Sequence, residues 1–282
     1  MSIHKKMLNA NNKSDLKKLM IISIEILHKK ATSYNVPIDE LSWYYDPLSQ
    51  KNLERYRRMY YIPNDIDPKS KNFLFMRFIT SLFNSGFHND MKFDKNKPEK
   101  VNLFRELSES THYFNVEKFL DNYKSIKSYE NNMLSRENLS KLNSKRIKNN
   151  AKSIYEIAIY LNEQNDIFDI KIDPFKQIKV FNMKTALYWD AIKESNLLDI
   201  AKPDTHIIDV LNSSFNLNLP KNQMADYEVI RSLFEKIAEA NSMTIYQVDK
   251  ILWLVCAKDK NAFYLHDTLN FKDQLLNQLS II

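Results

Sequence analysis

The chain of 282 residues contains a single glycine, Gly86, and this scarcity limits the folds available to it. Glycine supplies the positive backbone φ angles of many tight turns and the close backbone approach of phosphate-binding loops. With one glycine and eight prolines, the chain has few tight turns and no glycine-rich nucleotide-binding loop. Apolar residues recur at helical spacing along much of the sequence, and the two observations together predict an all-α fold.

The composition is that of an ordinary globular chain with a basic excess. Hydrophobic residues make up 44% of the sequence, and the mean hydropathy is −0.48. Lys and Arg number 41 against 35 Asp and Glu, which gives a net charge of +6. This excess is compatible with a polyanionic partner such as nucleic acid, but many basic proteins bind no nucleic acid.

Cysteine and histidine usage excludes several kinds of site. Cys256 is the only cysteine, so an internal disulfide and a four-cysteine iron–sulfur cluster are both impossible, and a reducing cytoplasm suits the chain. The six histidines are scattered without metal-ligand spacing. The single glycine also excludes the nucleophile elbow of a serine hydrolase. We therefore expect no metal and no cofactor.

The N-terminal segment is polar and lacks the apolar centre of a signal peptide. The longest early apolar run, residues 19–27, is interrupted by Ser23 and Glu25 and is too short to span a membrane. We expect a cytoplasmic monomer without a membrane partner.

Capping residues and apolar spacing predict helices along the chain. Ser14 and Asp15 are expected to begin the first helix, and Asp226 and Thr244 to begin two later ones. The expected helices cover residues 14–33, 49–61, 73–83, 101–108, 116–126, 136–142, 153–161, 226–240 and 244–253, with a short amphipathic helix in the tail.

Two segments are rich in basic residues, and each has two interpretations. Residues 49–61 interleave arginines with tyrosines, which can grip phosphates and stack on bases, or can pack at a core edge with the arginines in solvent. Residues 141–152 carry five cations and no acid. On a helix these cations form one broad face, which fits a phosphate-tracking surface or a merely solvated one.

Residues 181–211 contain two helix starts that carry ionisable side chains. Lys184 precedes the apolar run 186–191, so it is expected at or near a helix N-terminus. After the break at Lys202 and Pro203, Asp204 is expected to cap a second apolar helix. A carboxylate there lies at the positive end of the helix dipole, which favours its ionised form.

These residues carry a family resemblance. Lys184-Thr185-Ala186, followed by Asp204-Thr205-His206-Ile207, resembles the core of the helix-hairpin-helix DNA glycosylases, the superfamily that includes endonuclease III and the 8-oxoguanine DNA glycosylases. In that family the lysine position is the Schiff-base nucleophile of bifunctional members, and nearly all members require the aspartate. The resemblance implies that Lys184 and Asp204 are catalytic and that the enzyme removes a damaged or modified base.

The resemblance also implies an architecture and a partner. Two helical lobes would flank a cleft with a helix-hairpin-helix element, one lobe made of residues 72–198 and the other of residues 1–71 and 199–282. Asp204 would face Lys184 across the lobe junction. The partner would be double-stranded DNA with one modified base flipped out. Candidate DNA contacts are Lys145, Arg146, Lys148, Lys179, Phe181 and Asn182, and candidate base-pocket residues are Trp43, Tyr44, Phe87, Tyr188 and Trp189.

The sequence departs from the family pattern in the hairpin. Residues 178–184 contain no glycine, whereas the family hairpin uses glycine for close approach of backbone amides to a phosphate. Asn182 tolerates a left-handed conformation but Val180 suits it poorly. Asp209 also stands where an arginine is often found. Two alternatives therefore stay open: a catalytically inactive DNA-binding protein of the same fold, and an all-helical protein-interaction module.

Overall fold

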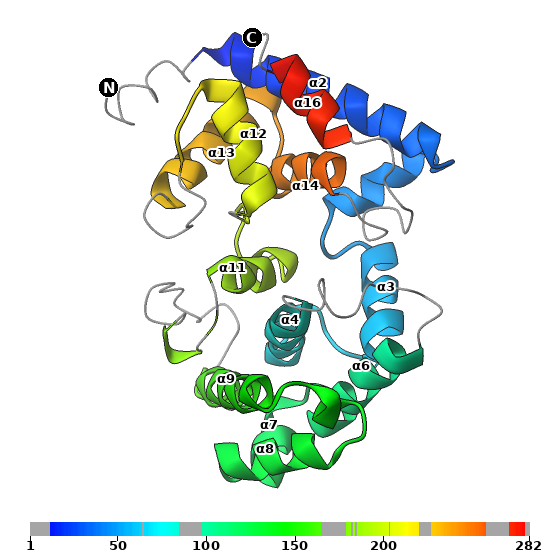
Figure 1. Ribbon diagram of the computed structural model, residues 1–282, viewed down its shortest axis with the longest axis vertical. Helices are drawn as coiled ribbons and strands as arrows, with labels where there is room; N and C mark the ends of the chain where they lie inside the picture. Colours follow the sequence, from blue (N-terminus) through cyan, green and yellow to red (C-terminus); the bar gives the residue numbers. More distant parts are fainter. Residues whose placement is uncertain are drawn as a thin grey trace. The chain divides into compact units, whose positions relative to one another are not determined.

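Every regular element in the computed structural model is a helix, as predicted, within residues 12–63, 65–84, 98–164, 179–181, 183, 185–202, 204–219, 227–257 and 271–279, which the structure describes. The helices form two compact units (Figure 1). We call residues 50–198 the central unit, and residues 1–49 with 199–282 the terminal unit. Among the described residues, no helix is both long and apolar enough to cross a membrane.

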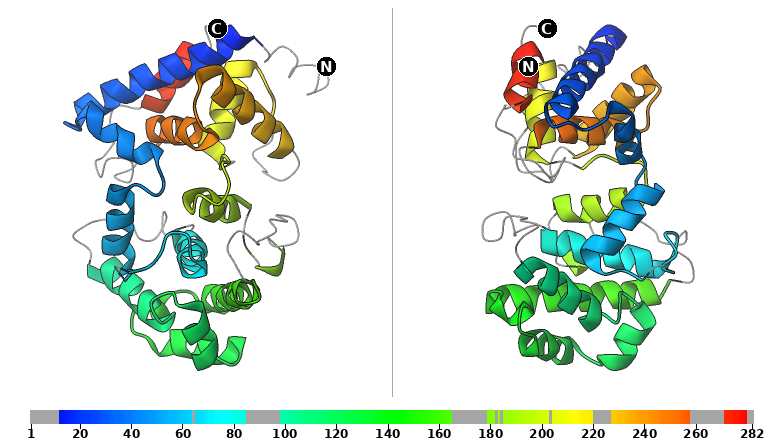
Figure 2. Two further views of the ribbon diagram at one scale, coloured as in Figure 1. Left: turned by 180° about the vertical axis from the view of Figure 1, so that it is seen from behind. Right: turned by 90° about the vertical axis from the view of Figure 1, so that its right-hand side faces the viewer.

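The terminal unit is built from both ends of the chain. Its helices are α2 (Lys13–Ser33), the 3-10 helix η1 (Ile38–Tyr45), α12 (Thr205–Phe215), α13 (Tyr227–Asn241), α14 (Ile245–Cys256) and α16 (Phe271–Leu279). α2 packs against α13, α14 and α16, and Figure 2 shows α16 alongside it. The two distant segments therefore share one core.

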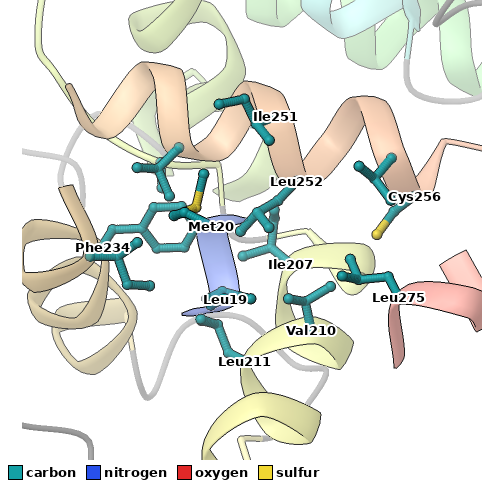
Figure 3. Packing of buried hydrophobic residues seen from close by; sticks show 14 of the residues in the cluster. Leu19, Met20, Ile207, Val210, Leu211, Phe234, Ile251, Leu252, Cys256 and Leu275 are labelled. Carbon is teal, nitrogen blue, oxygen red and sulfur yellow. The ribbon is translucent and has the colours of Figure 1, made fainter. Parts of the chain in front are cut away.

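That core surrounds α14, whose apolar residues face several neighbours at once. Figure 3 shows Leu252 of α14 among side chains from α2, α12 and α13, Ile251 on the other side of the α14 ribbon, and Cys256 beside Leu275 of α16. These side chains are at most a few per cent exposed. Burial of about 25 cal/mol per Å² of apolar surface is the main force that holds the segments together.

Both ends of α14 are tied to other parts of the terminal unit. Thr244 and Gln247 form a capping box at the helix start that the sequence predicts, and Asp199 also accepts hydrogen bonds from the first amides, Ile245 N at 3.0 Å and Tyr246 N at 2.7 Å. At the other end, the buried ammonium of Lys30 donates to carbonyl oxygens at 2.6 to 3.1 Å. The four orphan amides and carbonyls of each helix end need such partners.

The central unit is organised around α4 (Lys71–Asn84), which packs against α11 (Thr185–Glu194), α9 (Ser144–Asn162) and α7 (Val116–Asn122). α4 is buried on nearly all sides, and the side chains from Phe73 to Met76 are almost fully enclosed. The remaining elements are α3 (Gln50–Tyr60), α6 (Pro98–Ser110), α8 (Ile126–Ser135) and η2 (Leu139–Lys141). α3 packs against α6, and it therefore belongs to the central unit.

Two of the expected helices in the central unit are wrong. Residues 116–126 do not form one helix, because α7 ends at Asn122 and α8 begins at Ile126. Ser125 takes an extended conformation and forms a capping box with Ser128, which starts the new helix. Residues 136–142, expected as a helix, contain only the single 3-10 turn η2.

Asparagine takes the place of glycine at several helix ends. Asn35, Asn196 and Asn216 have φ angles of 55°, 55° and 46° just after α2, α11 and α12. Asparagine tolerates this left-handed conformation better than other non-glycine residues. The turn after α6 is more strained, since His112, Tyr113 and Phe114 all have positive φ. The chain thus terminates these helices without glycine.

Candidate active site around Asp204

Asp204 is the N-cap of α12, as the sequence predicts. Its backbone is extended, and its Oδ1 accepts hydrogen bonds from His206 N at 2.9 Å and Ile207 N at 3.0 Å. The helix then buries Ile207 and Ile208 in the terminal core. The first amides of a helix have no acceptor within the helix, and the Asp204 carboxylate supplies one for two of them. These two hydrogen bonds fix the position of the carboxylate.

The turn before Asp204 is held by a buried carboxylate from α14. Asp249, which is 1% exposed, accepts a hydrogen bond from Lys202 N at 2.9 Å, and Asp204 N donates to Lys202 O at 2.8 Å. The position of Asp204 therefore depends on both α12 and α14. Sequence reasoning did not select Asp249, although an acid inside the apolar run 245–256 is the signal that could have found it.

The second oxygen of the Asp204 carboxylate is the one that can act on a ligand. The side chain is half-buried, and among the described residues only Oδ1 accepts hydrogen bonds. Oδ2 keeps its capacity to accept a proton or to lie beside a positive charge. The arrangement supplies one fixed oxygen and one available oxygen on a rigid helix start.

A network of three ionisable side chains adjoins Asp204. Lys272 of α16 places its Nζ 2.6 Å from Asp209 Oδ2 and 3.4 Å from His206 Nδ1. Burial is the main cause that lowers the pKa of His206; Lys272 lowers it further, and Asp204 and Asp209 raise it. A neutral imidazole can accept a hydrogen bond from the ammonium at Nδ1, with its single N–H then on Nε2.

Asp209 therefore has a specific role in this chain. Its ion pair with Lys272 joins α12 to α16. Both side chains are mostly buried, at 24% and 14% exposed. The ion pair between Asp209 and Lys272 is not evident from the sequence, because the two residues are far apart along the chain.

Cys256 lies near this network but has no nucleophilic character. Its side chain is fully buried in the packing of Figure 3, and burial raises the pKa of the thiol to about 12. The thiol is protonated near neutral pH, and the thiolate is the reactive form. Cys256 is a core residue.

Several predicted site residues lie outside the described parts of the chain. These are Lys184, Asn182 and Phe87, and the side chains of Trp43 and Tyr44 within η1. α11 begins at Thr185, directly after Lys184. The Lys184 block belongs to the central unit and Asp204 to the terminal unit.

The structure places the side chain of Phe181 in the core of the central unit. Its side chain is completely buried and packs edge-on against Phe78 and Tyr160 at centroid distances of 5.4 and 5.3 Å. The side chain is therefore a core residue that a phosphate cannot reach. Tyr188 and Trp189 are also buried, at 0% and 5% exposed, and they pack in the core of the central unit rather than stand on its surface.

The predicted basic contacts differ in exposure. Lys145 and Lys148 on α9 and Lys179 are exposed, whereas Arg146 is half-buried. An exposed lysine keeps its charge available to an anionic partner, and a half-buried arginine has less freedom to reach one.

The end of α11 holds buried charges that the sequence did not single out. Glu194 lies 3.5 Å from Lys193 Nζ and 4.0 Å from Arg77 Nη2 of α4, and these residues are 3 to 5% exposed. Ser81 of α4 adds hydrogen bonds to Leu187 O at 2.8 Å and Asp190 Oδ2 at 3.1 Å. The α4–α11 contact therefore has a polar as well as an apolar part.

No protein-family model, curated protein or solved structure matches the chain. The chemistry open to the site is therefore inferred from the geometry at Asp204 and from the sequence resemblance. Within the described ranges, no group of three or more His, Cys, Asp or Glu side chains is placed to hold a metal ion.

Proposed function

We propose that the protein is a DNA glycosylase, which cleaves the N-glycosidic bond of a damaged or modified base flipped out of double-stranded DNA. The observation that carries the proposal is the Asp204 carboxylate, with Oδ1 held by two backbone amides of α12 and Oδ2 available. The order and spacing of the Lys184 and Asp204 blocks supply the substrate class by resemblance.

The chemistry needs a fixed anion. As the bond between C1′ of the sugar and the base breaks, positive charge develops on the sugar, and a carboxylate beside it stabilises the transition state. Asp204 Oδ2 can also take the proton of a water molecule that attacks C1′. The base then leaves with the electron pair of the bond and gains a proton from solvent.

A second route uses Lys184 as the nucleophile. Its amine must be neutral to attack C1′ and displace the base, which leaves with the electron pair of the glycosidic bond. The bound amine then loses a proton, and the C1′–O4′ bond opens to give a protonated imine and a free 4′-hydroxyl, which allows strand cleavage. This role follows from the resemblance alone. Sodium borohydride reduces such an imine to a stable protein–DNA adduct, so a Lys184→Ala variant that forms no adduct would assign the amine.

The experiment that tests the proposal is base release from duplexes that each carry one altered base. The native protein should release at least one of these bases, and Asp204→Asn should lose the release while it still binds the duplex. Asp39→Asn is the matched control, because Asp39 is an exposed carboxylate of the same unit. Absence of release from every duplex, with native folding, would refute the proposal.

The second candidate is a catalytically inactive DNA-binding protein. The glycine-free segment 178–184 favours it, because the family hairpin contacts a phosphate through glycine-containing backbone. Duplex binding without base release from any substrate would select this alternative.

A further inference from the structure

α9 presents a row of lysines on its exposed face. Lys145, Lys148 and Lys152, which we call the lysine stripe, are all exposed. Their spacing of three and four residues places them one above the other on a helix. The opposite face, with Ile147, Ala151, Ile154, Ile157, Ala158 and Leu161, is buried in the core of the central unit.

The charge of the lysine stripe is not neutralised by the protein. Among the described residues, none of the three ammonium groups forms an ion pair or a hydrogen bond. Three other exposed lysines of the central unit pair with acids three or four residues away: Lys124 with Asp121, Lys127 with Glu130 and Lys141 with Glu137. The first turn of α9 contains no acid at all.

We infer that the lysine stripe binds the phosphate backbone of a nucleic acid without reading its sequence. With a rise of 1.5 Å per residue, the stripe is about 10 Å long. One strand of a duplex advances about 3.4 Å along the axis for each phosphate, so the stripe spans about three phosphates. The inference deepens the proposed function, on which it rests for the choice of DNA as the polyanion.

The residues around the stripe favour nucleic acid over a membrane or a protein. A helix that lies on a membrane inserts an apolar face beside its basic residues, but the apolar face of α9 is already buried. A protein partner usually needs apolar or aromatic anchors at the centre of the contact. Ser144 and Asn149 are the other exposed residues of this part of α9, and both are polar, as in phosphate-binding surfaces.

The test replaces all three lysines of the stripe with glutamine in the full chain. Binding to a duplex without a modified base is measured by fluorescence anisotropy at several salt concentrations from roughly 50 to 200 mM, because affinity that depends on phosphate contacts falls steeply over this range. The control replaces Lys17, Lys18 and Lys29 of α2, which are also exposed. Both variants lose three positive charges from the net +6, so they differ only in where the charge was.

The stripe variant should bind at least about tenfold more weakly at low salt, and its salt slope should fall by about 2.7, or 0.9 for each of three phosphates. Over this salt range the native protein should then lose about 40-fold more affinity than the variant does. The control should keep a slope close to the native one. Equal losses of duplex affinity in both variants, or an unchanged salt slope in the stripe variant, would overturn the inference. It would also be overturned if the stripe variant lost binding to anionic vesicles but kept its binding to the duplex.

Base release separates this inference from the proposed function. If the native protein binds duplexes through the stripe but releases no base, only the role of Asp204 fails. If base release depends on Asp204 but binding is insensitive to the stripe, only the stripe inference fails.

Discussion

The buried ammonium of Lys30 is expected to hold the C-terminal end of α14 in place. Its Nζ donates to Leu254 O at 2.9 Å, Val255 O at 3.1 Å and Ala257 O at 2.6 Å, and the side chain is 1% exposed. The carbonyls at a helix C-terminus lack partners within the helix, and a cation there is favoured by the helix dipole. The contact joins the N-terminal helix to the C-terminal segment of the terminal unit.

Replacing Lys30 with methionine keeps the apolar stem and removes the donors. Three carbonyl oxygens then lose their partner, at a cost of about 1 kcal/mol or more each. Because the buried ammonium no longer has to be desolvated in the variant, part of this cost is offset. We expect a loss of about 3 kcal/mol, which corresponds to a factor of about 100 in the opening equilibrium of α14.

Hydrogen exchange of the α14 amides measures this loss locally. Protection of the peptide that covers Ile245–Cys256 should fall about 100-fold in Lys30→Met, because exchange reports the free energy of opening. Lys29→Met is the matched control, since Lys29 is exposed and its loss should change stability by less than about 0.5 kcal/mol. Protection of α14 within a factor of about three of the native value would refute the role of Lys30.

Two further predictions concern buried ionisable groups. Burial is the main cause that lowers the pKa values of His112 and His206 from 6.5. The unfolded chain therefore binds more protons, and unfolding should become easier as the pH falls through 6.5. The urea midpoint should be lower below this pH than above it, and His112→Asn should reduce the difference. Glu194→Ala removes the carboxylate beside Arg77 and Lys193 and should destabilise the central unit by about 3 kcal/mol, measured by urea unfolding, whereas an unchanged midpoint would contradict a stabilising role.

Local signals in the sequence predicted some helix starts and missed others, since α2 is capped by Asn12 rather than by Ser14 or Asp15. Asp204 caps α12 and Thr244 caps α14 as expected, because an N-cap depends only on residues within three positions. The helix break at Ser125 is equally local, but the apolar residues of 116–126 masked the capping signal. The all-α class followed from glycine scarcity and apolar spacing, which are properties of the whole chain.

Long-range contacts could not be predicted from the sequence. Lys30 has the neighbours of an ordinary solvated lysine, and its carbonyl partners lie 224 or more residues away. The contacts near Asp204 are also long-range: Asp249 accepts from Lys202 N, and Lys272 contacts His206 and Asp209. Both residues come from helices whose positions are set by core packing. The burial of Phe181 could not be predicted either, because the hairpin pattern gives no information on burial, and its ring belongs to an aromatic cluster drawn from α4, α9 and α11.

The central claim, that Asp204 acts directly on the glycosidic bond, is tested by single-turnover base release with native protein and Asp204→Asn on the same modified duplex. Asparagine can still accept the amide hydrogen bonds of the cap, so folding and duplex affinity should be retained. Release should then slow by on the order of 100-fold or more, because the negative charge is lost where positive charge develops. Release by Asp204→Asn at the native rate would contradict the claim.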